Sequence, residues 1–182
     1  GARVRLSAEQ LRDQCLDISG LLSDKMYGPS VFPYQPNGIW LSPWNGAEWL
    51  QSKGEDQYRR ALYTYWKRSA AYPSMMTFDG VSRDVCTVRR IRTNTPLQAL
   101  ALLNEVSFVE AARKLAERTL NSGSADVDRR LRFAFRAVLT RDPTDRESAV
   151  LKRGVEQRRA PYRVHRDEAA AVIRTGETAA DT

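Results

Sequence analysis

The chain has 182 residues, enough for one domain with a hydrophobic core, and its content of 42% hydrophobic and 28% charged residues is ordinary for a soluble globular protein. No run approaches the roughly 18 apolar residues of a membrane-spanning helix, so a membrane span is excluded. The net charge is +7, and arginine supplies 24 of the 29 basic residues. These residues are spread along the chain, which indicates a solvated basic surface or an anionic partner and weakens the case for nucleic acid.

The first predicted element is a helix over about residues 8–23. Ser7 and Gln10 have the spacing of a capping box, and the apolar residues after them recur at helical intervals. The segment before Ser7 has no signal-peptide features. We therefore expect the chain to begin within a longer protein.

Residues 27–56 are punctuated by proline and glycine and predict a long loop. Its many aromatic side chains either pack on the body of the domain, form a carbohydrate-stacking or peptide-binding surface, or dock onto other parts of a parent chain. The candidates for an exposed aromatic surface, taken from this loop and the segment after it, are Tyr34, Trp40, Trp44 and Trp66.

Residues 57–68 are ambiguous, because their apolar side chains fit both the alternation of a strand and the spacing of a helix. Their aromatic content favours a strand, which could pair with residues 85–92 in a short two-stranded β-ribbon. Between these segments, residues 72–80 predict a loop that ends in the turn pair Asp79 and Gly80.

A run of helices is predicted after Thr95. Thr95 is a suitable N-cap, Pro96 fits the first helical position, and Gln98 completes a capping box, so a helix is expected over residues 96–103. The residues of this helix expected to face inward are Leu97, Leu100 and Leu103.

Three more helices are predicted to follow. One covers about residues 105–121, one begins at Asp126 or Asp128, and one opens at the Thr144–Glu147 capping box and runs to about residue 159. Pro161 is expected to end this section, and a short last helix is expected over residues 167–174. The short connections predict antiparallel neighbours in a bundle.

The predicted fold is therefore mainly α: a small helical bundle with a long aromatic-rich loop region and, as an option, the short β-ribbon. We expect a single domain over residues 1–176, followed by a frayed tail over 177–182. Within the domain, residues 26–94 are the loop-rich aromatic and basic part, and residues 95–160 are the helical bundle.

The arginine run before the helix at residue 96 is the best candidate for a binding site. If this run is a strand, Arg90 and Arg92 lie on one face and Arg89 on the other. Beside the free amides of a helix N-terminus, they could bind a carboxylate, sulfate or phosphate group. The candidate residues of this anion site are Arg89, Arg90, Arg92, Thr93, Asn94 and Gln98.

Two alternatives give the same arginines a structural role. They could pair with internal carboxylates and brace the loop, or they could dock onto other domains. The internal carboxylates considered as partners are Asp56, Asp79 and Asp84.

No catalytic constellation is readable, so enzymatic activity stays undecided. The single histidine, His165, lies in an arginine-rich stretch, and the sequence contains no phosphate loop and no Cys-x-x-Cys-His haem motif. Cys15 and Cys86 lack the spacing of a zinc site and are either bonded to each other or two buried thiols. We expect no metal and no cofactor in this chain.

Five unusual motifs occur in series: Gly28-Pro-Ser-Val31, Gly38-Ile-Trp40, Tyr58-Arg-Arg60, Pro73-Ser-Met75 and Arg92-Thr-Asn-Thr-Pro-Leu-Gln-Ala-Leu100. In their order and spacing they resemble the planctomycete PSD-one domain. The resemblance covers about residues 4–175 and implies that the chain is the C-terminal part of that domain. One departure is Gly80-Val-Ser82, where the family pattern leads us to expect Ala-Pro-Asp.

The resemblance implies a domain of unknown function, often accompanied by a cytochrome c-like haem domain in large exported bacterial proteins. It implies a periplasmic or otherwise extracytoplasmic location, with any haem held by another domain of the parent protein. It supplies no established catalytic residues. We therefore expect a module for interdomain or partner interactions. The alternatives are a domain that binds or processes carbohydrate, sulfated polysaccharide included, and a basic nucleic-acid-binding domain.

Overall fold

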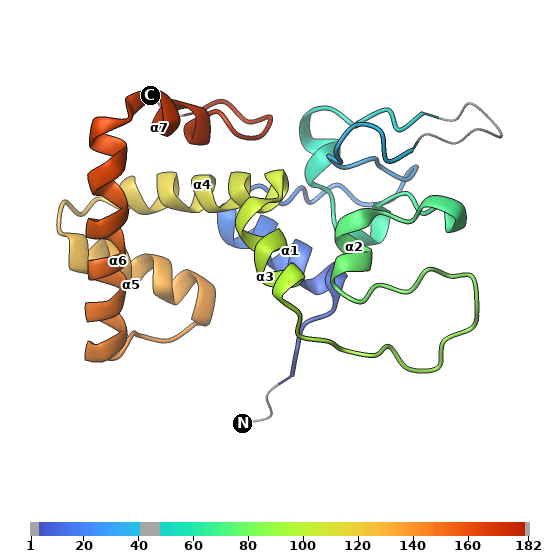
Figure 1. Cartoon of the computed structure of the whole chain (residues 1–182), viewed down its shortest axis with the longest axis horizontal. Helices are drawn as coiled ribbons and strands as arrows, with labels where there is room; N and C mark the ends of the chain where they lie inside the picture. The colour runs from blue at the N-terminus through green and yellow to red at the C-terminus, as the bar shows by residue number, and fades with distance from the viewer. Residues whose placement is uncertain (1–3, 41–47, 181–182) are drawn as a thin grey trace. The chain divides into compact units, whose positions relative to one another are not determined.

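The computed structural model describes residues 4–40 and 48–180 and is mainly helical, as the sequence predicts (Figure 1). The residues of the predicted single domain form two compact units. Unit 1 comprises residues 1–17 and 21–108, and unit 2 comprises residues 18–20 and 109–182. None of the helices in the described ranges has both the length and the apolar character needed to cross a membrane.

Unit 1 combines few α-helices with much irregular backbone. Helix α1 (Ala8–Ser19) is shorter than the predicted helix over 8–23, because Gly20 adopts a left-handed φ of 78° and ends it. Helices α2 (Pro73–Thr77) and α3 (Pro96–Asn104) pack against each other. Three short 3-10 helices lie between α1 and α2, at Gly54–Tyr58, Ala61–Tyr63 and Arg68–Ala70.

The predicted β-ribbon does not form. Residues 57–68 instead make two isolated parallel bridges to earlier loop segments, Ser23 to Arg59 and Val31 to Thr64, while residues 85–92 form no strand. The backbone amide of Val31 donates to the carbonyl of Tyr63 at 2.8 Å, which shows where the hydrogen bonds of this segment go. The 3-10 turns on either side of each bridge keep the contact from growing into a ladder.

The core of unit 1 is small and aromatic. The aromatic loop packs onto it rather than standing free: Trp49 stacks on Tyr72 at 5.7 Å between ring centroids, and Phe32 contacts Trp49 at 5.0 Å. Trp44 lies outside the described residues. The buried residues that form the core cluster are Ala8, Ala61, Tyr72, Met75, Phe78 and Phe108.

Arg59 is the most deeply placed charge in unit 1, with 1% of its surface exposed. Its guanidinium donates to the backbone carbonyls of Lys25, Tyr27 and Pro29 at 3.3, 2.5 and 3.1 Å. The same group lies 3.7 Å from the centroid of the Tyr63 ring. Arg59 therefore satisfies loop carbonyls that no helix or sheet could pair.

Unit 2 contains most of α4 (Val106–Leu120), together with α5 (Val127–Leu139), α6 (Asp145–Val164) and α7 (Arg166–Ile173). Helices α5 and α6 pack side by side (Figure 1). The predicted end at Pro161 is wrong, since α6 continues through it to Val164. Proline lacks only its own donor, and the Pro161 carbonyl still accepts from the amide of His165 at 2.9 Å.

The C-terminal segment of unit 2 is tied to α4. The carboxylate of Glu110, a buried residue, accepts hydrogen bonds from the amides of Glu177 and Thr178 at 2.9 and 2.8 Å. Gly176 permits this approach: its φ is 96°, and a Cβ there would lie 2.2 Å from the Glu110 carboxyl carbon. Residues 177 and 178, expected in a frayed tail, are thus held by hydrogen bonds.

Candidate functional site: an arginine-lined cavity

The site begins with a clasp between Asp79 and Thr93. Asp79 follows α2 with a left-handed φ of 63°, which aspartate tolerates better than most residues. Its two carboxylate oxygens accept from the backbone amide and the hydroxyl of Thr93 at 2.8 and 2.7 Å. The Thr93 amide and hydroxyl hold the pKa of Asp79 below its ordinary value. These bonds close the loop of residues 80–92 at its base.

Gln98 locks the clasp onto α3. The predicted capping box is confirmed: Thr95 accepts from the Gln98 amide, and the Gln98 side chain accepts from the Thr95 amide. The same side chain, only 2% exposed, donates to the Thr77 carbonyl at 3.0 Å and to the Thr93 hydroxyl at 3.0 Å. It also accepts from Arg5 at 2.5 Å. Gln98 is therefore a structural junction with no spare group for a ligand.

Gly80 allows the loop to leave this junction. Its amide donates to the carbonyl of Met75 at 2.7 Å, and a Cβ at this position would lie 2.6 Å from that carbonyl oxygen. Glycine at position 80, where the family pattern predicts alanine, thus permits the close approach of the two backbones.

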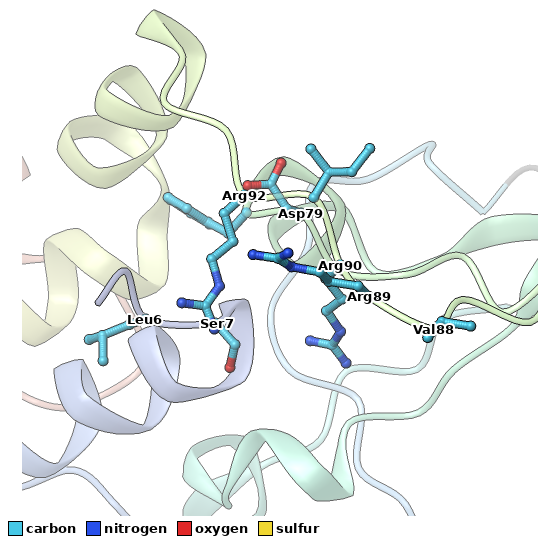
Figure 2. A pocket seen from close by; sticks show the side chains of 9 residues that line it. Leu6, Ser7, Asp79, Val88, Arg89, Arg90 and Arg92 are labelled. Atoms are coloured by element: carbon cyan, nitrogen blue, oxygen red, sulfur yellow. The ribbon is translucent and has the colours of Figure 1, made fainter. Parts of the chain in front are cut away.

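Between the clasped loop and the start of α1 lies a cavity of about 810 Å³. Figure 2 shows the arginine side chains reaching from the loop into the gap beside Leu6 and Ser7. In the described part of the chain the cavity is lined by Leu6, Ser7, Phe78, Asp79, Val88, Arg89, Arg90, Ile91 and Arg92.

One of the three arginines is neutralised by an ion pair. Arg90 pairs with Glu9 of α1 at 2.7 Å, and both side chains are about one-third exposed, at 38% and 32%. The hydrogen bond from Arg90 lowers the pKa of Glu9, and the same bond raises the pKa of Arg90. Glu9 was not among the predicted partners of the arginines.

Arg89 and Arg92 are exposed and make no ion pair with any residue in the described ranges. The prediction that an arginine pairs with an internal carboxylate holds for Arg90, but with Glu9 in place of the carboxylates named. Asp79 is bound by Thr93, Asp56 pairs with Lys25 at 2.8 Å, and Asp84 forms no ion pair with a described residue. The cavity wall therefore carries two guanidinium groups whose hydrogen-bonding capacity is available to a ligand.

The predicted alternation of the arginines is also wrong, since residues 85–92 are not a strand and all three arginines line one cavity. The other anion candidates lie apart from it. Asn94 is exposed and is not part of the cavity wall, and Thr93 and Gln98 belong to the clasp.

The aromatic candidates are half-buried and fixed by hydrogen bonds. The indole of Trp40 donates to the Ala70 carbonyl and that of Trp66 to the Ser82 carbonyl, both at 3.1 Å. The carbonyl of Tyr34 accepts from the Tyr72 hydroxyl at 2.7 Å. None of these three described residues lines the arginine cavity.

The cavity loop and α3 both carry exposed aliphatic side chains. The prediction that the three leucines of α3 face inward is wrong, because each is more than half exposed. Their spacing of three residues places them on one face of the helix. The exposed fractions are 73% for Val85, 104% for Val88, 80% for Ile91, 61% for Leu97, 57% for Leu100 and 72% for Leu103.

The cysteines are free, so the Cys15–Cys86 disulfide does not form, and the alternative of two buried thiols does not fit either. Cys15 is half-buried, with a thiol whose pKa is raised by burial, and Cys86 is exposed on the loop. Across residues 4–40 and 48–180, no three histidine, cysteine or acidic side chains gather in a way that could hold a metal ion.

A family model for PSD1, described as a protein of unknown function (DUF1553), matches residues 1–155. The match includes α1, the arginine loop and α3, and it reaches the middle of α6. Comparisons with curated proteins and with solved structures gave no significant match.

Proposed function

Because the chain belongs to the PSD1 family of proteins of unknown function, we propose, from its own geometry, that it is an interaction module. It binds an apolar segment that carries carboxylates, supplied by another domain of a parent chain or by a partner protein. The binding region, called the docking surface below, consists of Val85, Val88, Arg89, Ile91, Arg92, Leu97, Leu100 and Leu103.

The observation that carries this proposal is that six large aliphatic side chains are each more than half exposed within a stretch of nineteen residues, from Val85 to Leu103. Fully burying one such side chain is worth about 1.5–3 kcal/mol. Exposed apolar groups in such concentration, rimmed by polar residues, are typical of protein interaction sites. The leucines of α3 share one helix face that a partner helix can cover, and the preceding loop adds the exposed side chains of Val88 and Ile91.

Charge decides the chemistry of the partner. Arg89 and Arg92 stand among the aliphatic side chains without carboxylate partners of their own. An arginine guanidinium forms two parallel hydrogen bonds with a carboxylate, and a neutral or basic segment has no carboxylate to accept them. With a net charge of +7, the chain also attracts an acidic partner at long range.

The family resemblance supports a partner within the same parent chain. Relatives are expected in large exported proteins that often carry a cytochrome c-like domain, so we propose an extracytoplasmic location, with any haem bound outside this chain. Nucleic acid is the weaker alternative, because the exposed aliphatic residues of the docking surface suit a protein partner better than a phosphate backbone.

The experiment uses three fluorescent peptides that share one amphipathic helical pattern of leucines. One peptide has glutamates beside the leucines, one has lysines at the same positions, and one has the glutamate sequence scrambled. We expect fluorescence anisotropy to show binding of the glutamate peptide at least about tenfold tighter than the other two, a difference of 1.4 kcal/mol.

Variants of the chain then locate the binding. Leu100→Asp and Arg92→Gln should each weaken binding of the glutamate peptide. Leu62→Asp, which changes an 80% exposed leucine outside the docking surface, should leave that binding unchanged. Equal affinity for the glutamate and lysine peptides, or unchanged binding by both docking variants, would contradict the proposal.

A further inference from the structure

Unit 1 contains a second cavity, separate from the arginine loop, in the aromatic segment. It has a volume of about 300 Å³, at the lower end of the ~300–1,000 Å³ range of small-molecule sites. The described residues that matter for its chemistry are Gln35, Asn37, Trp40, Glu48, Trp49 and Gln51. We propose that this cavity binds a neutral saccharide, a function that goes beyond the proposed docking role.

The first argument is the buried amide of Gln35. This residue is only 7% exposed, yet its side-chain oxygen is buried without a hydrogen-bond partner. An unsatisfied buried acceptor costs about 1–3 kcal/mol, which a protein retains where a ligand supplies the missing donor. Gln35 lines the cavity, so a small rotation of its side chain would present this oxygen to a ligand hydroxyl.

The second argument is the kind of polar group in the wall. The side-chain amides of Gln35, Asn37 and Gln51 both donate and accept, and the carboxylate of Glu48 accepts. Sugar hydroxyls have the matching dual capacity. The described lining residues include no arginine or lysine, in contrast to the arginine cavity, and the one charged group among them is the carboxylate of Glu48.

The third argument is the rigid aromatic wall. The rings of Trp40 and Trp49 meet edge to face at 5.1 Å between centroids. Their indole N–H groups are bound to the carbonyls of Ala70 at 3.1 Å and Pro33 at 2.8 Å, which fixes the rings. Tyr72 stacks on Trp49 and the Lys67 ammonium lies over Trp40, so a ligand meets only the uncovered ring surfaces. Apolar C–H groups of a sugar ring fit such surfaces, and its hydroxyls fit the amides.

The test is saturation-transfer NMR on the whole chain with a defined set of sugars. The neutral probes are glucose, galactose, mannose, N-acetylglucosamine, cellobiose and lactose, and the charged probes are glucuronic acid and glucosamine. We expect saturation transfer from the protein to at least one neutral sugar, and a shift of the Trp40 indole signal. Binding of the charged sugars alone, or of none of the probes, would overturn the proposal.

Matched variants place the binding in this cavity. Gln35→Met removes the unpartnered oxygen at similar volume, and Asn37→Ala alters an exposed residue that the fold does not need. Each should raise the dissociation constant of the neutral sugar about fivefold or more. The control, Gln14→Met on the exposed side of α1, should leave it unchanged. Wild-type affinity in both cavity variants would overturn the assignment.

Discussion

The two units of the molecule differ in how their backbone N–H and C=O groups find hydrogen-bond partners. In unit 1 the backbone is irregular, and buried polar side chains such as Arg59 and Gln98 satisfy its carbonyls and amides. In unit 2 the backbone is mostly helical and satisfies itself, apart from the C-terminal segment that buried Glu110 and Arg113 hold. Helices α5, α6 and α7 contain no buried residue. Capping residues and surface ion pairs complete unit 2. Single buried side chains therefore matter most in unit 1.

Arg59→Met should have the largest effect, because it removes the buried group that donates to the carbonyls of Lys25, Tyr27 and Pro29 and lies over the Tyr63 ring. We expect unit 1 to lose about 3 kcal/mol or more of unfolding free energy. Urea denaturation followed by tryptophan fluorescence measures it, since all four tryptophans lie between residues 40 and 66.

Arg60→Met is the matched control for Arg59→Met, because Arg60 is the exposed neighbour. It should unfold like the wild type. If the two variants unfold at the same urea concentration, the contrast between the units is wrong. If helix content in unit 2 persists while the fluorescence of the Arg59 variant changes, the contrast is sharpened, because the units then unfold separately.

Gln98→Leu should have an intermediate effect. It removes the donors to Thr77 and Thr93 and the capping-box acceptor for the Thr95 amide. We expect a loss of about 2–3 kcal/mol in the same urea experiment. Asn104→Leu, at the exposed end of α3, is the control. A loss for Gln98→Leu no greater than that of the control would mean that the clasp does not hold unit 1 together.

Glu147→Gln should have the smallest effect, visible as a change in pH dependence. The side chain of Arg141 and the amide of Thr144 lower the pKa of Glu147 to about 2. Because this folded-state pKa lies below the unfolded value of ~4.3, the stabilisation is present above that value and is lost as the pH falls toward 2.

Circular dichroism melts between pH 2 and 6 would test the pH dependence, together with NMR titration of the Glu147 carboxyl. The wild type should lose stability in this window more steeply than Glu147→Gln. Glu156→Gln, an exposed position on the same helix, should retain the wild-type slope. Parallel slopes for the wild type and Glu147→Gln would show that this ion pair does not contribute to unit 2.

The helices of the C-terminal half could be predicted closely because their signals are local. The capping boxes at Thr95 and Thr144 and the cap at Asp126 fix where α3, α6 and α5 begin. The predicted helix end at Pro161 was wrong because a proline near a helix end removes one hydrogen-bond donor without forcing the chain out of the helix.

The candidate site was harder to predict because its contacts join distant residues. The run of arginines could be recognised, but the pairing of Arg90 with Glu9 spans 81 positions in the sequence. The spacing of Leu97, Leu100 and Leu103 shows that they share a helix face, but it does not show whether anything covers that face. The sequence offered one weak indication for Glu9, which is an acidic residue in the first turn of α1.

The clasp between Asp79 and Thr93 separates recognition from folding. It closes the loop of residues 80–92 with hydrogen bonds that involve none of the arginines. Doubling the length of a flexible loop costs only about 0.6 kcal/mol, so the loop can gain, lose or exchange residues while unit 1 stays folded. A loop closed in this way can change its length and composition without loss of the hydrogen bonds at its base.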